Sequence, residues 1–342
     1  MPQRKHLNSW VTMKHSNISI FVPHIGCPHI CSFCDQRTIS GAQSAPTAED
    51  VRRTCEQALA EIREPQDTEI AFFGGSFTAI PRRYMLELLE AAESFVGEGK
   101  FRGIRLSTRP DYIDEEVLSI LNEHGVTSIE LGAQSMDDVV LTANERGHSA
   151  EEVRRASALI RSYGFELGLQ MMTGLYMSSL ESDMATAREI VRIKPDTVRI
   201  YPVVVLKGTR LGELYESGEY EMPPFDDMVK LCAELIMLFY ENGIRVIKCG
   251  LHASDGVDGE RVAGYYHPAF RELCDMYIYR DRIEKLIADC TDTEVRISVN
   301  DRCISRAVGQ KKANIEYFRG RGKKVMIEGD SSLRIYECRF RR

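Results

Sequence analysis

The sequence predicts an α/β protein: a partial or closed parallel β/α barrel of the TIM-like kind, followed by a small α+β appendage. Between about residues 17 and 250, short β-branched segments alternate with longer segments of helical periodicity, which is typical of βαβ units and a parallel sheet. Glycines and polar residues repeatedly follow the strand-like segments, where a barrel places its functional groups. After about residue 285 this rhythm stops. A doubly wound sheet is the competing architecture.

The elements of the barrel follow from local patterns. Thr47, with Glu49 and Asp50 behind it, is suited to begin a helix, and Gly125 is suited to end one. The strands predicted in chain order are Ile18–Val22, Glu69–Phe73, Gly103–Leu106, Ser128–Gly132, Glu166–Met172, Thr197–Val203 and Ile244–Lys248. The helices predicted between them are Thr47–Arg63, Tyr84–Val96, Glu115–Glu123, Ala150–Tyr163, Leu180–Ile193 and Asp226–Glu241.

The C-terminal part differs in charge and in pattern. Residues 302–324 hold eight Lys or Arg and a single acid, Glu316. Strands are predicted at Glu294–Val299 and Val325–Glu328, with a helix-like stretch over Ser305–Phe318 between them. The predicted organisation is therefore an N-terminal extension, a barrel, a connecting segment near the barrel mouth and a small basic domain, at residues 1–16, 17–250, 251–284 and 285–342.

Composition excludes several classes of protein. The 342 residues carry 44 Lys and Arg against 51 Asp and Glu, a net charge of −7, which argues against general coating of nucleic acid but is compatible with a local basic patch. With 43% hydrophobic residues the chain is not wholly disordered. No apolar run approaches the roughly 20 residues that span a bilayer. The ten cysteines do not form the pattern of a small secreted scaffold, so we expect a cytoplasmic protein with reduced thiols and no membrane association.

Three of the cysteines are crowded into one loop after the first predicted strand. Cys27, Cys31 and Cys34 have the spacing C-x3-C-x2-C. Three thiolates can each bind one iron of a 4Fe–4S cluster and leave the fourth iron open to another ligand. One alternative is a zinc site completed by His24 or His29. The other is three unrelated buried thiols.

The cysteine motif resembles that of the radical S-adenosylmethionine superfamily. The resemblance implies that S-adenosylmethionine chelates the open iron and is cleaved reductively to a 5′-deoxyadenosyl radical, with the electron coming from a flavodoxin or ferredoxin type of donor. It also implies that Phe33 contacts the adenine, that Gly74, Gly75 and Ser76 contact the methionine amine, and that Arg146 helps to hold this co-substrate. Polar residues at the next strand ends would contact its ribose and carboxylate. They are Ser107, Thr108, Arg109, Gln134 and Gln170.

Longer strings resemble the catalytic subunit of Elongator. They are Ser107-Thr108-Arg109-Pro110-Asp111-Tyr112-Ile113, Glu130-Leu131-Gly132-Ala133-Gln134-Ser135, Arg146-Gly147-His148 and the segment from Ile200 to Leu211. This resemblance implies a transferase that modifies the wobble uridine of transfer RNA. Two differences stand out: Cys27 and Cys31 are much closer together than the matching Elongator cysteines, and no acetyltransferase domain is expected before the chain ends at Arg342.

Three functional hypotheses follow. The first is a radical enzyme acting on RNA, with a transfer RNA base as its target. The second keeps the chemistry and replaces RNA by a small molecule or peptide, and the third is a non-catalytic zinc or iron–sulfur scaffold. For the first, the segment from Ile304 to Ile315 weakly resembles a KH module: Gly309-Gln310-Lys311-Lys312 matches its Gly-x-x-Gly turn, except that Lys312 replaces the second glycine.

Overall fold

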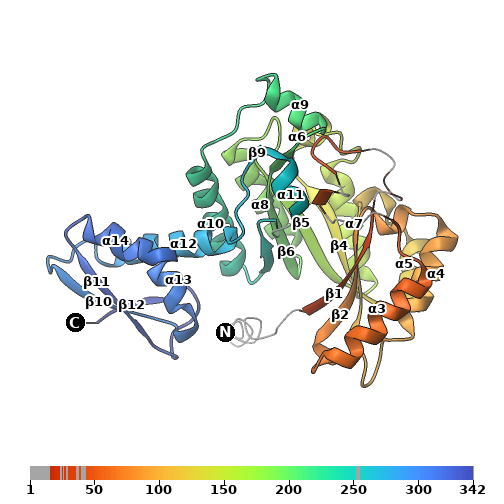
Figure 1. The fold of residues 1–342 in the computed structure, drawn as a ribbon, viewed down its shortest axis with the longest axis horizontal. Helices are drawn as coiled ribbons and strands as arrows, with labels where there is room; N and C mark the ends of the chain where they lie inside the picture. Colours follow the sequence, from red (N-terminus) through yellow and green to blue (C-terminus); the bar gives the residue numbers. More distant parts are fainter. Residues whose placement is uncertain are drawn as a thin grey trace.

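A computed structural model describes residues 16–23, 25, 27, 30–35, 38–39, 44–251 and 255–341. A single curled sheet of seven parallel strands dominates it (Figure 1). Their hydrogen-bonded order is β1-β2-β3-β4-β5-β6-β8, so the chain adds each strand beside the previous one with no reversal. The strands are β1 (Ser16–Val22), β2 (Thr68–Gly74), β3 (Gly103–Thr108), β4 (Val126–Gln134), β5 (Glu166–Thr173), β6 (Thr197–Pro202) and β8 (Arg245–Cys249).

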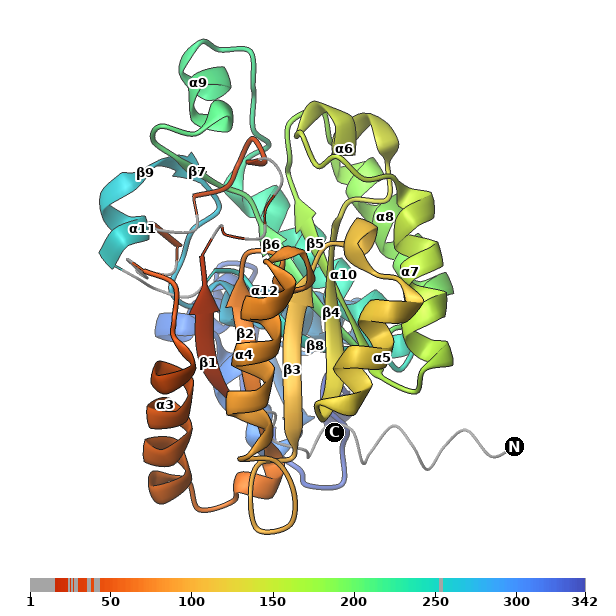
Figure 2. The same ribbon diagram turned by 90° about the vertical axis from the view of Figure 1, so that its right-hand side faces the viewer.

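This sheet is a partial barrel with β1 and β8 at its two edges, which confirms the predicted fold class. Figure 2 shows the arrowheads of the strands directed to one end and the helices on the outer face. A doubly wound sheet would instead reverse its strand order at a switch point. The helices are α3 (Ala48–Glu61), α4 (Arg82–Glu93), α5 (Glu115–Glu123), α6 (Asp138–Ala143), α7 (Ala150–Ser162), α8 (Leu180–Ile193) and α10 (Phe225–Glu241).

Local sequence sets where these helices begin. The Thr47 hydroxyl accepts a hydrogen bond from the Asp50 amide, and the Asp50 carboxylate accepts one from the Thr47 amide, so the two ends of this capping box satisfy donors that a helix start leaves unpaired. Ser149 caps α7 in the same manner with Glu152. Both features place the observed helix starts within a residue of the predicted ones.

The strands separate an apolar outer face from a largely polar interior. On β2, Ile70 and Phe72 belong to the hydrophobic core with the helices, whereas Glu69 binds Arg105 inside the barrel and Phe73 lines its cavity. This alternation is the two-residue period of a strand. A barrel interior with charged groups is therefore built into the same strands that make the apolar core.

Shorter elements lie beyond the carboxyl ends of the strands. There β7 (Val204–Leu206) pairs antiparallel with β9 (Arg261–Gly264), and α9 (Arg210–Glu216) and α11 (Asp255–Glu260) lie beside them (Figure 2). The long helix α12 (Phe270–Leu286) then leads to the C-terminal subdomain (Figure 1). In its described residues, the predicted connecting segment thus contains α11, β9 and most of α12. None of the described helices is long and apolar enough to cross a membrane.

The C-terminal subdomain is a three-stranded sheet covered by two short helices. Its strand order is β11-β10-β12, with β10 and β11 parallel and β12 antiparallel to β10. The elements are β10 (Glu294–Val299), α13 (Ile304–Val308), α14 (Ala313–Arg319), β11 (Lys324–Gly329) and β12 (Cys338–Arg341). The KH-like character of this domain stays a prediction.

The helix-like stretch predicted over Ser305–Phe318 is two helices in the structure, because a turn at residues 309–312 separates α13 from α14. Gly309, Lys311 and Lys312 have φ angles of 81°, 50° and 64°, outside the right-handed helical region. A Cβ at Gly309 would lie 2.8 Å from the Met276 sulfur of α12. Close packing on α12 therefore requires a glycine here, and the two lysines complete a left-handed turn.

Replacing Lys312 with glycine is expected to stabilise the protein by up to about 1 kcal/mol. A left-handed conformation costs an L-residue roughly 1–2 kcal/mol, and glycine avoids this at some cost in chain entropy. Thermal unfolding of the purified variant measures the gain. Lys312→Ala is the matched control because it removes the same charge and keeps the Cβ. An equal gain in both variants would show that charge, and not backbone conformation, is responsible.

Candidate active site

A cavity of about 530 Å³ opens at the carboxyl ends of the barrel strands. Every strand of the large sheet contributes to its lining, together with the cysteine loop after β1. Of the predicted co-substrate residues, the lining includes Phe33, Gly74, Ser107, Gln134 and Gln170, and of the predicted cluster ligands it includes Cys34. The cavity also has cations that the sequence analysis missed, Arg199 from β6 and Lys248 from β8.

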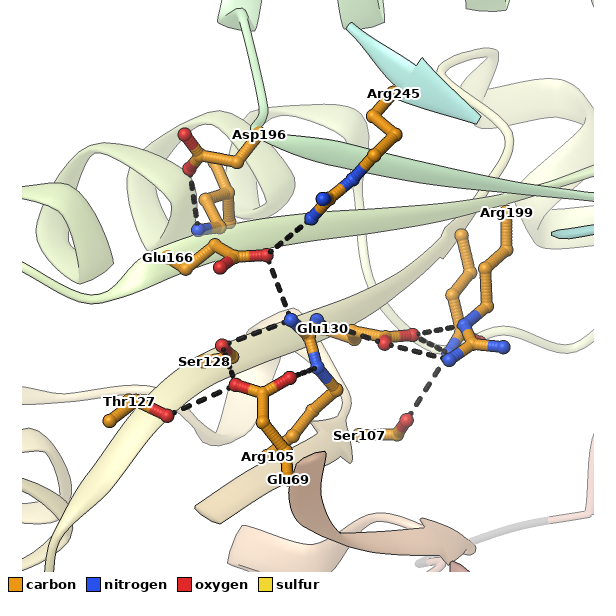
Figure 3. Close-up of polar contacts among 12 residues, drawn as sticks. Glu69, Arg105, Ser107, Thr127, Ser128, Glu130, Glu166, Asp196, Arg199 and Arg245 are labelled. Carbon is orange, nitrogen blue, oxygen red and sulfur yellow. Dashed lines mark hydrogen bonds and ion pairs between the residues drawn. The ribbon is translucent and has the colours of Figure 1, made fainter. Parts of the chain in front are cut away.

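A network of buried charges lies inside the barrel below this cavity (Figure 3). Arg105, which is fully buried, donates from Nε to Glu69 (2.7 Å) and from its two terminal nitrogens to Glu130 (3.1 Å) and Glu166 (2.8 Å). Arg245 also approaches Glu166, at 3.5 Å. A buried charge is tolerated only when partner groups compensate it. Each charged side chain of this network therefore depends on the others for its stability in the barrel interior.

Glu130 connects the network to the cavity. Its carboxylate accepts hydrogen bonds from Arg199 Nε (2.6 Å) and from Gln170 Nε2 (3.0 Å), both of which line the cavity. Burial alone would raise the pKa of Glu130, but Arg199 and Arg105 hold it at about 2. Gly168 leaves room for this arrangement, since a Cβ there would lie 2.7 Å from Glu130 Cγ. Arg199 and Gln170 are thus fixed to the barrel wall by a permanently charged carboxylate.

Gln134 has a strained backbone and an unused hydrogen-bond acceptor. It ends β4 with a φ of 63°, a left-handed conformation that is uncommon for a residue with a side chain. Its side chain is buried, lines the cavity, and its Oε1 has no hydrogen-bond partner among the described residues. Strain and an unpaired buried acceptor both concentrate at binding sites. Gln134 Oε1 is therefore available to a donor group of a bound molecule.

Gly74 lets the backbones of β1 and β2 meet at the cavity. It has a φ of 112°, and a Cβ there would lie 2.8 Å from the Val22 carbonyl oxygen. The next amide, of Gly75, donates to that same carbonyl at 2.8 Å. Only glycine combines this conformation with such a close approach.

The cysteine loop is attached to the barrel by Arg146. One terminal nitrogen of Arg146 donates to Cys31 Sγ at 3.0 Å and the other donates to the Gly132 carbonyl at 2.6 Å. Cys31 is buried, Cys27 and Cys34 are half-buried, and burial raises the pKa of the Cys27 thiol. Among the described residues no three His, Cys, Asp or Glu side chains are already arranged around one point as metal ligands. The cluster ligands therefore stay a prediction, and His24 and His29 lie outside the described residues.

Family comparisons decide the classification. The family model for the Radical SAM superfamily matches residues 21–190, and that for the Radical SAM C-terminal domain matches residues 195–280. The chain belongs to the radical SAM superfamily. The matched residues include the cysteine loop, the end of β1, the six other strands of the barrel and most of α12.

Several curated relatives of this radical SAM protein are named as Elongator proteins or transfer RNA uridine acetyltransferases. The tRNA uridine(34) acetyltransferase of Dehalococcoides mccartyi is 27% identical, over 64% of this chain and 55% of that protein. Elongator complex protein 3 of Homo sapiens is 30% identical, over 50% of this chain and 35% of that protein. The chain thus spans about half the length, or less, of these curated relatives. The solved archaeal Elp3 of Methanocaldococcus infernus, 21% identical, matches 78% of this chain and 63% of its own with a TM-score of 0.63, which supports a shared fold.

The remaining predicted contacts of the radical SAM protein lie around the cavity and not in its lining. The Ser76 and Thr108 hydroxyls share a hydrogen bond of 2.8 Å, and Thr108 shares another of 2.6 Å with Thr78. Arg109 is buried and forms an ion pair with Asp111 at 2.8 Å. Gly75 and Arg146 are likewise outside the lining. These residues stay predicted contacts, and their observed bonds hold the strand ends together.

The residues present fit the cofactors that the superfamily implies. Three thiols on one loop match the donor set of a cluster with one open iron, and Cys34 lies at the same cavity as Gln134. Gln134 Oε1, which has no partner among the described residues, could accept a hydrogen bond from the ammonium or a hydroxyl group of S-adenosylmethionine. Gly74 has no side chain, so the backbone at the end of β2 is open to close approach. Among the described residues, one thiol of the cysteine loop, the free acceptor of Gln134 and the space of the cavity therefore lie together at the carboxyl ends of the strands.

Asp183 should make stability depend on pH. This buried residue of α8 accepts a hydrogen bond from the Gly174 amide at 2.8 Å, yet burial raises its pKa to about 7. A carboxyl whose pKa is higher in the folded state binds its proton more tightly there, so it destabilises the fold increasingly as pH rises from about 4 to about 7 and fully above that.

Replacing Asp183 with asparagine is therefore expected to make stability less dependent on pH, by about 1.4 kcal/mol for each unit by which the pKa was raised. Urea unfolding of both proteins at about pH 4.5 and about pH 8 measures this difference. Glu181→Gln, at an exposed position of the same helix, is the control. Equal pH dependence in wild type and Asp183→Asn would contradict the assignment.

Proposed function

We propose that this protein is a radical SAM enzyme that cleaves S-adenosylmethionine reductively at a 4Fe–4S cluster and modifies RNA, with a base of transfer RNA as the target. One observation carries the proposal. The cavity of this superfamily member brings Cys34 of the three-cysteine loop together with Gln134, whose buried Oε1 has no partner among the described residues. Relatives named for transfer RNA uridine modification support the choice of substrate.

The residues of this chain would share the work as follows. Cys27, Cys31 and Cys34 would hold the cluster, which when bound supplies the electron that breaks a carbon–sulfur bond of the sulfonium. Gln134 would accept a hydrogen bond from the co-substrate, and Arg146, which donates to Cys31 Sγ, would orient the loop. The electron would come from a flavodoxin or ferredoxin type of protein in the cytoplasm.

The cations of the cavity suit an anionic substrate. Arg199 is held by Glu130, and Lys248, whose pKa is lowered by burial and by Arg199, has no carboxylate partner among the described residues. A positive charge that its own protein does not neutralise favours a bound anion. The phosphates of RNA provide such groups.

Anaerobic reconstitution tests the proposal directly. The purified protein is given iron, sulfide, dithionite, S-adenosylmethionine and an unmodified transfer RNA transcript, and the products are separated by liquid chromatography with mass spectrometry. We expect 5′-deoxyadenosine together with a nucleoside of altered mass. Absence of 5′-deoxyadenosine from protein that holds its cluster would refute the chemistry. Formation of 5′-deoxyadenosine with unchanged RNA, and with a modified small molecule or peptide instead, would refute the substrate.

A further inference from the structure

A second cavity lies between the barrel and the C-terminal subdomain. It measures about 640 Å³ and is lined by the end of β8, the start of α12 and residues of the 302–310 segment, which contains α13. Figure 1 shows α12 joining the barrel to the subdomain, with α13 on the side nearer the barrel. We call this cavity the cleft. Lys248 and Leu251 line both the cleft and the barrel cavity, so the two spaces share a wall.

The cleft carries more positive than negative charge. Its cations are Lys248, Arg271, Arg302 and Arg306, and its carboxylates are Glu272 and Asp275. The buried Asp275 carboxylate faces both Arg271, at 3.0 Å, and Arg306, at 3.5 Å, so it cannot neutralise both. Gln310 Nε2 donates a hydrogen bond of 3.3 Å to Glu272, which keeps its negative charge, so four cations face two carboxylates. The remaining positive charge faces the space between the two domains.

Ion pairs show which of the basic residues in 302–324 are available to a ligand. Arg319 pairs with Glu316, Lys324 pairs with Glu294, and Lys323 donates to backbone carbonyls. In contrast, no carboxylate in the described part of the chain pairs with Arg302, Lys311 or Lys312, all three of which are exposed. The available charges thus gather at the turn of residues 309–312 and beside it, at the edge of the cleft.

The turn is anchored to α12 and α13 by packing and hydrogen bonds. Gly309 packs on Met276 of α12. The side-chain Nδ2 of Asn314 donates hydrogen bonds of 2.9 Å to the backbone carbonyls of both Met276 and Ala307. Two consecutive lysines stay in the left-handed region, which is costly and is typical of sites under functional constraint. A preorganised basic turn loses little conformational entropy when it binds a phosphate chain.

We propose that the cleft and the 309–312 turn bind the phosphate backbone of a single-stranded segment of RNA and so hold one nucleotide at the mouth of the barrel cavity. The proposal rests on the proposed function for its choice of RNA. The unpaired cations of the turn would contact phosphates beside the cleft, and Lys248 would continue this positive path into the barrel cavity. A base extruded from the strand would then reach the site where the chemistry takes place.

The test compares two full-length variants that lose the same charge. Lys311→Gln combined with Lys312→Gly removes both lysine charges and relieves the backbone at residue 312. Arg319→Gln combined with Lys324→Gln removes two charges that are paired with carboxylates and lie away from the turn. Binding of a labelled single-stranded oligoribonucleotide and of a transfer RNA transcript is followed by fluorescence anisotropy between about 50 and 200 mM salt. Thermal unfolding checks the fold of both variants.

We expect the turn variant to bind single-stranded RNA at least about tenfold more weakly than wild type. The slope of log affinity against log salt concentration should become smaller by about one to two. The affinity of the control variant should stay within about twofold of wild type. Equal weakening in both variants would overturn the proposal, because the whole basic surface would then act without specificity. Unchanged binding in the turn variant would overturn it as well. A duplex of the same sequence or a polyglutamate peptide serves as a competitor. If either binds as tightly as the single-stranded oligoribonucleotide, the site recognises any polyanion and the proposed preference for single-stranded RNA is refuted.

The same proteins separate this inference from the proposed function. Reductive cleavage of S-adenosylmethionine by wild type without RNA needs no contact in the cleft. If wild type cleaves S-adenosylmethionine and the turn variant binds RNA as tightly as wild type, the proposed function stands and the proposed role of the cleft is refuted. RNA bound at the turn by a reconstituted protein that makes no 5′-deoxyadenosine would support the cleft and refute the radical chemistry.

Discussion

Replacing Arg105 with methionine is expected to destabilise the protein by about 3–5 kcal/mol, because removal of one partner from a buried ion pair leaves uncompensated charge in the interior. The Arg105 side chain is fully buried and binds three carboxylates, those of Glu69, Glu130 and Glu166. Methionine replaces the aliphatic part of the side chain and supplies none of its five hydrogen-bond donors. Urea unfolding monitored by circular dichroism measures the loss of stability.

Arg83→Met is the matched control for this prediction. Arg83 forms a single ion pair with Glu87 at 2.9 Å, and both side chains are largely exposed, at 92% and 48%. Such exposed pairs contribute about 0–1 kcal/mol, so the control should change stability by less than about 1 kcal/mol. If Arg105→Met lost no more than Arg83→Met, water would have to reach the network, and the barrel interior could not be as closed as the structure has it.

The Arg105 network also explains how the cavity stays polar without becoming flexible. Glu130 receives hydrogen bonds from Arg105 on β3, Gln170 on β5 and Arg199 on β6. Neighbouring parallel strands are thereby linked through side chains as well as through backbone hydrogen bonds. A milder variant, Glu130→Gln, would keep the volume and remove the charge that fixes Arg199 beside the cavity. The network thus couples the stability of the sheet to the position of the cations that face the substrate.

Much of the fold could be predicted because its signals are local. Glu115–Glu123 and Leu180–Ile193 were predicted with the bounds that the structure has, since Asp114 and Ser179 cap them and their apolar residues recur at helical spacing. The turn at 309–312 could not be predicted in this way. Gln, Lys and Ala all favour helices, and the packing of Gly309 on Met276 that breaks the helix comes from a segment more than thirty residues earlier.

The residues of the candidate site likewise fall into those that local sequence identifies and those that only the fold identifies. Gln134 and Gln170 were identified because polar residues at strand ends are conspicuous, and both line the cavity. Arg199 and Lys248 were missed because they lie within strands that seemed simply buried. The signal that was present is their position: Arg199 alone is charged in Thr197–Val203, and a charge in a buried strand requires a partner elsewhere. That partner, Glu130, lies 69 residues away in the sequence, so only the fold identifies it.

Replacing Cys31 with alanine is expected to abolish reductive cleavage of S-adenosylmethionine and leave the barrel folded. The variant loses one of the three thiolates proposed to hold the cluster and also the sulfur that accepts a hydrogen bond from Arg146. Loss of even an outer partner of a metal ligand typically costs about 10–100-fold in metal affinity or activity, so loss of a ligand should exceed about 100-fold. Iron and sulfide content after anaerobic reconstitution, together with 5′-deoxyadenosine formation, measure the effect.

Cys55→Ala separates a ligand from a merely buried thiol. Cys55 is fully buried in α3, so its loss leaves a similar small void in the core without touching the cysteine loop. We expect this variant to keep its iron and its cleavage activity and to lose only about 1 kcal/mol of stability. If Cys31→Ala behaved in the same way, with full iron and full 5′-deoxyadenosine, Cys31 would be a packing residue. The open iron, the partnerless acceptor of Gln134 and the bond from Arg146 to Cys31 could then no longer be parts of one site.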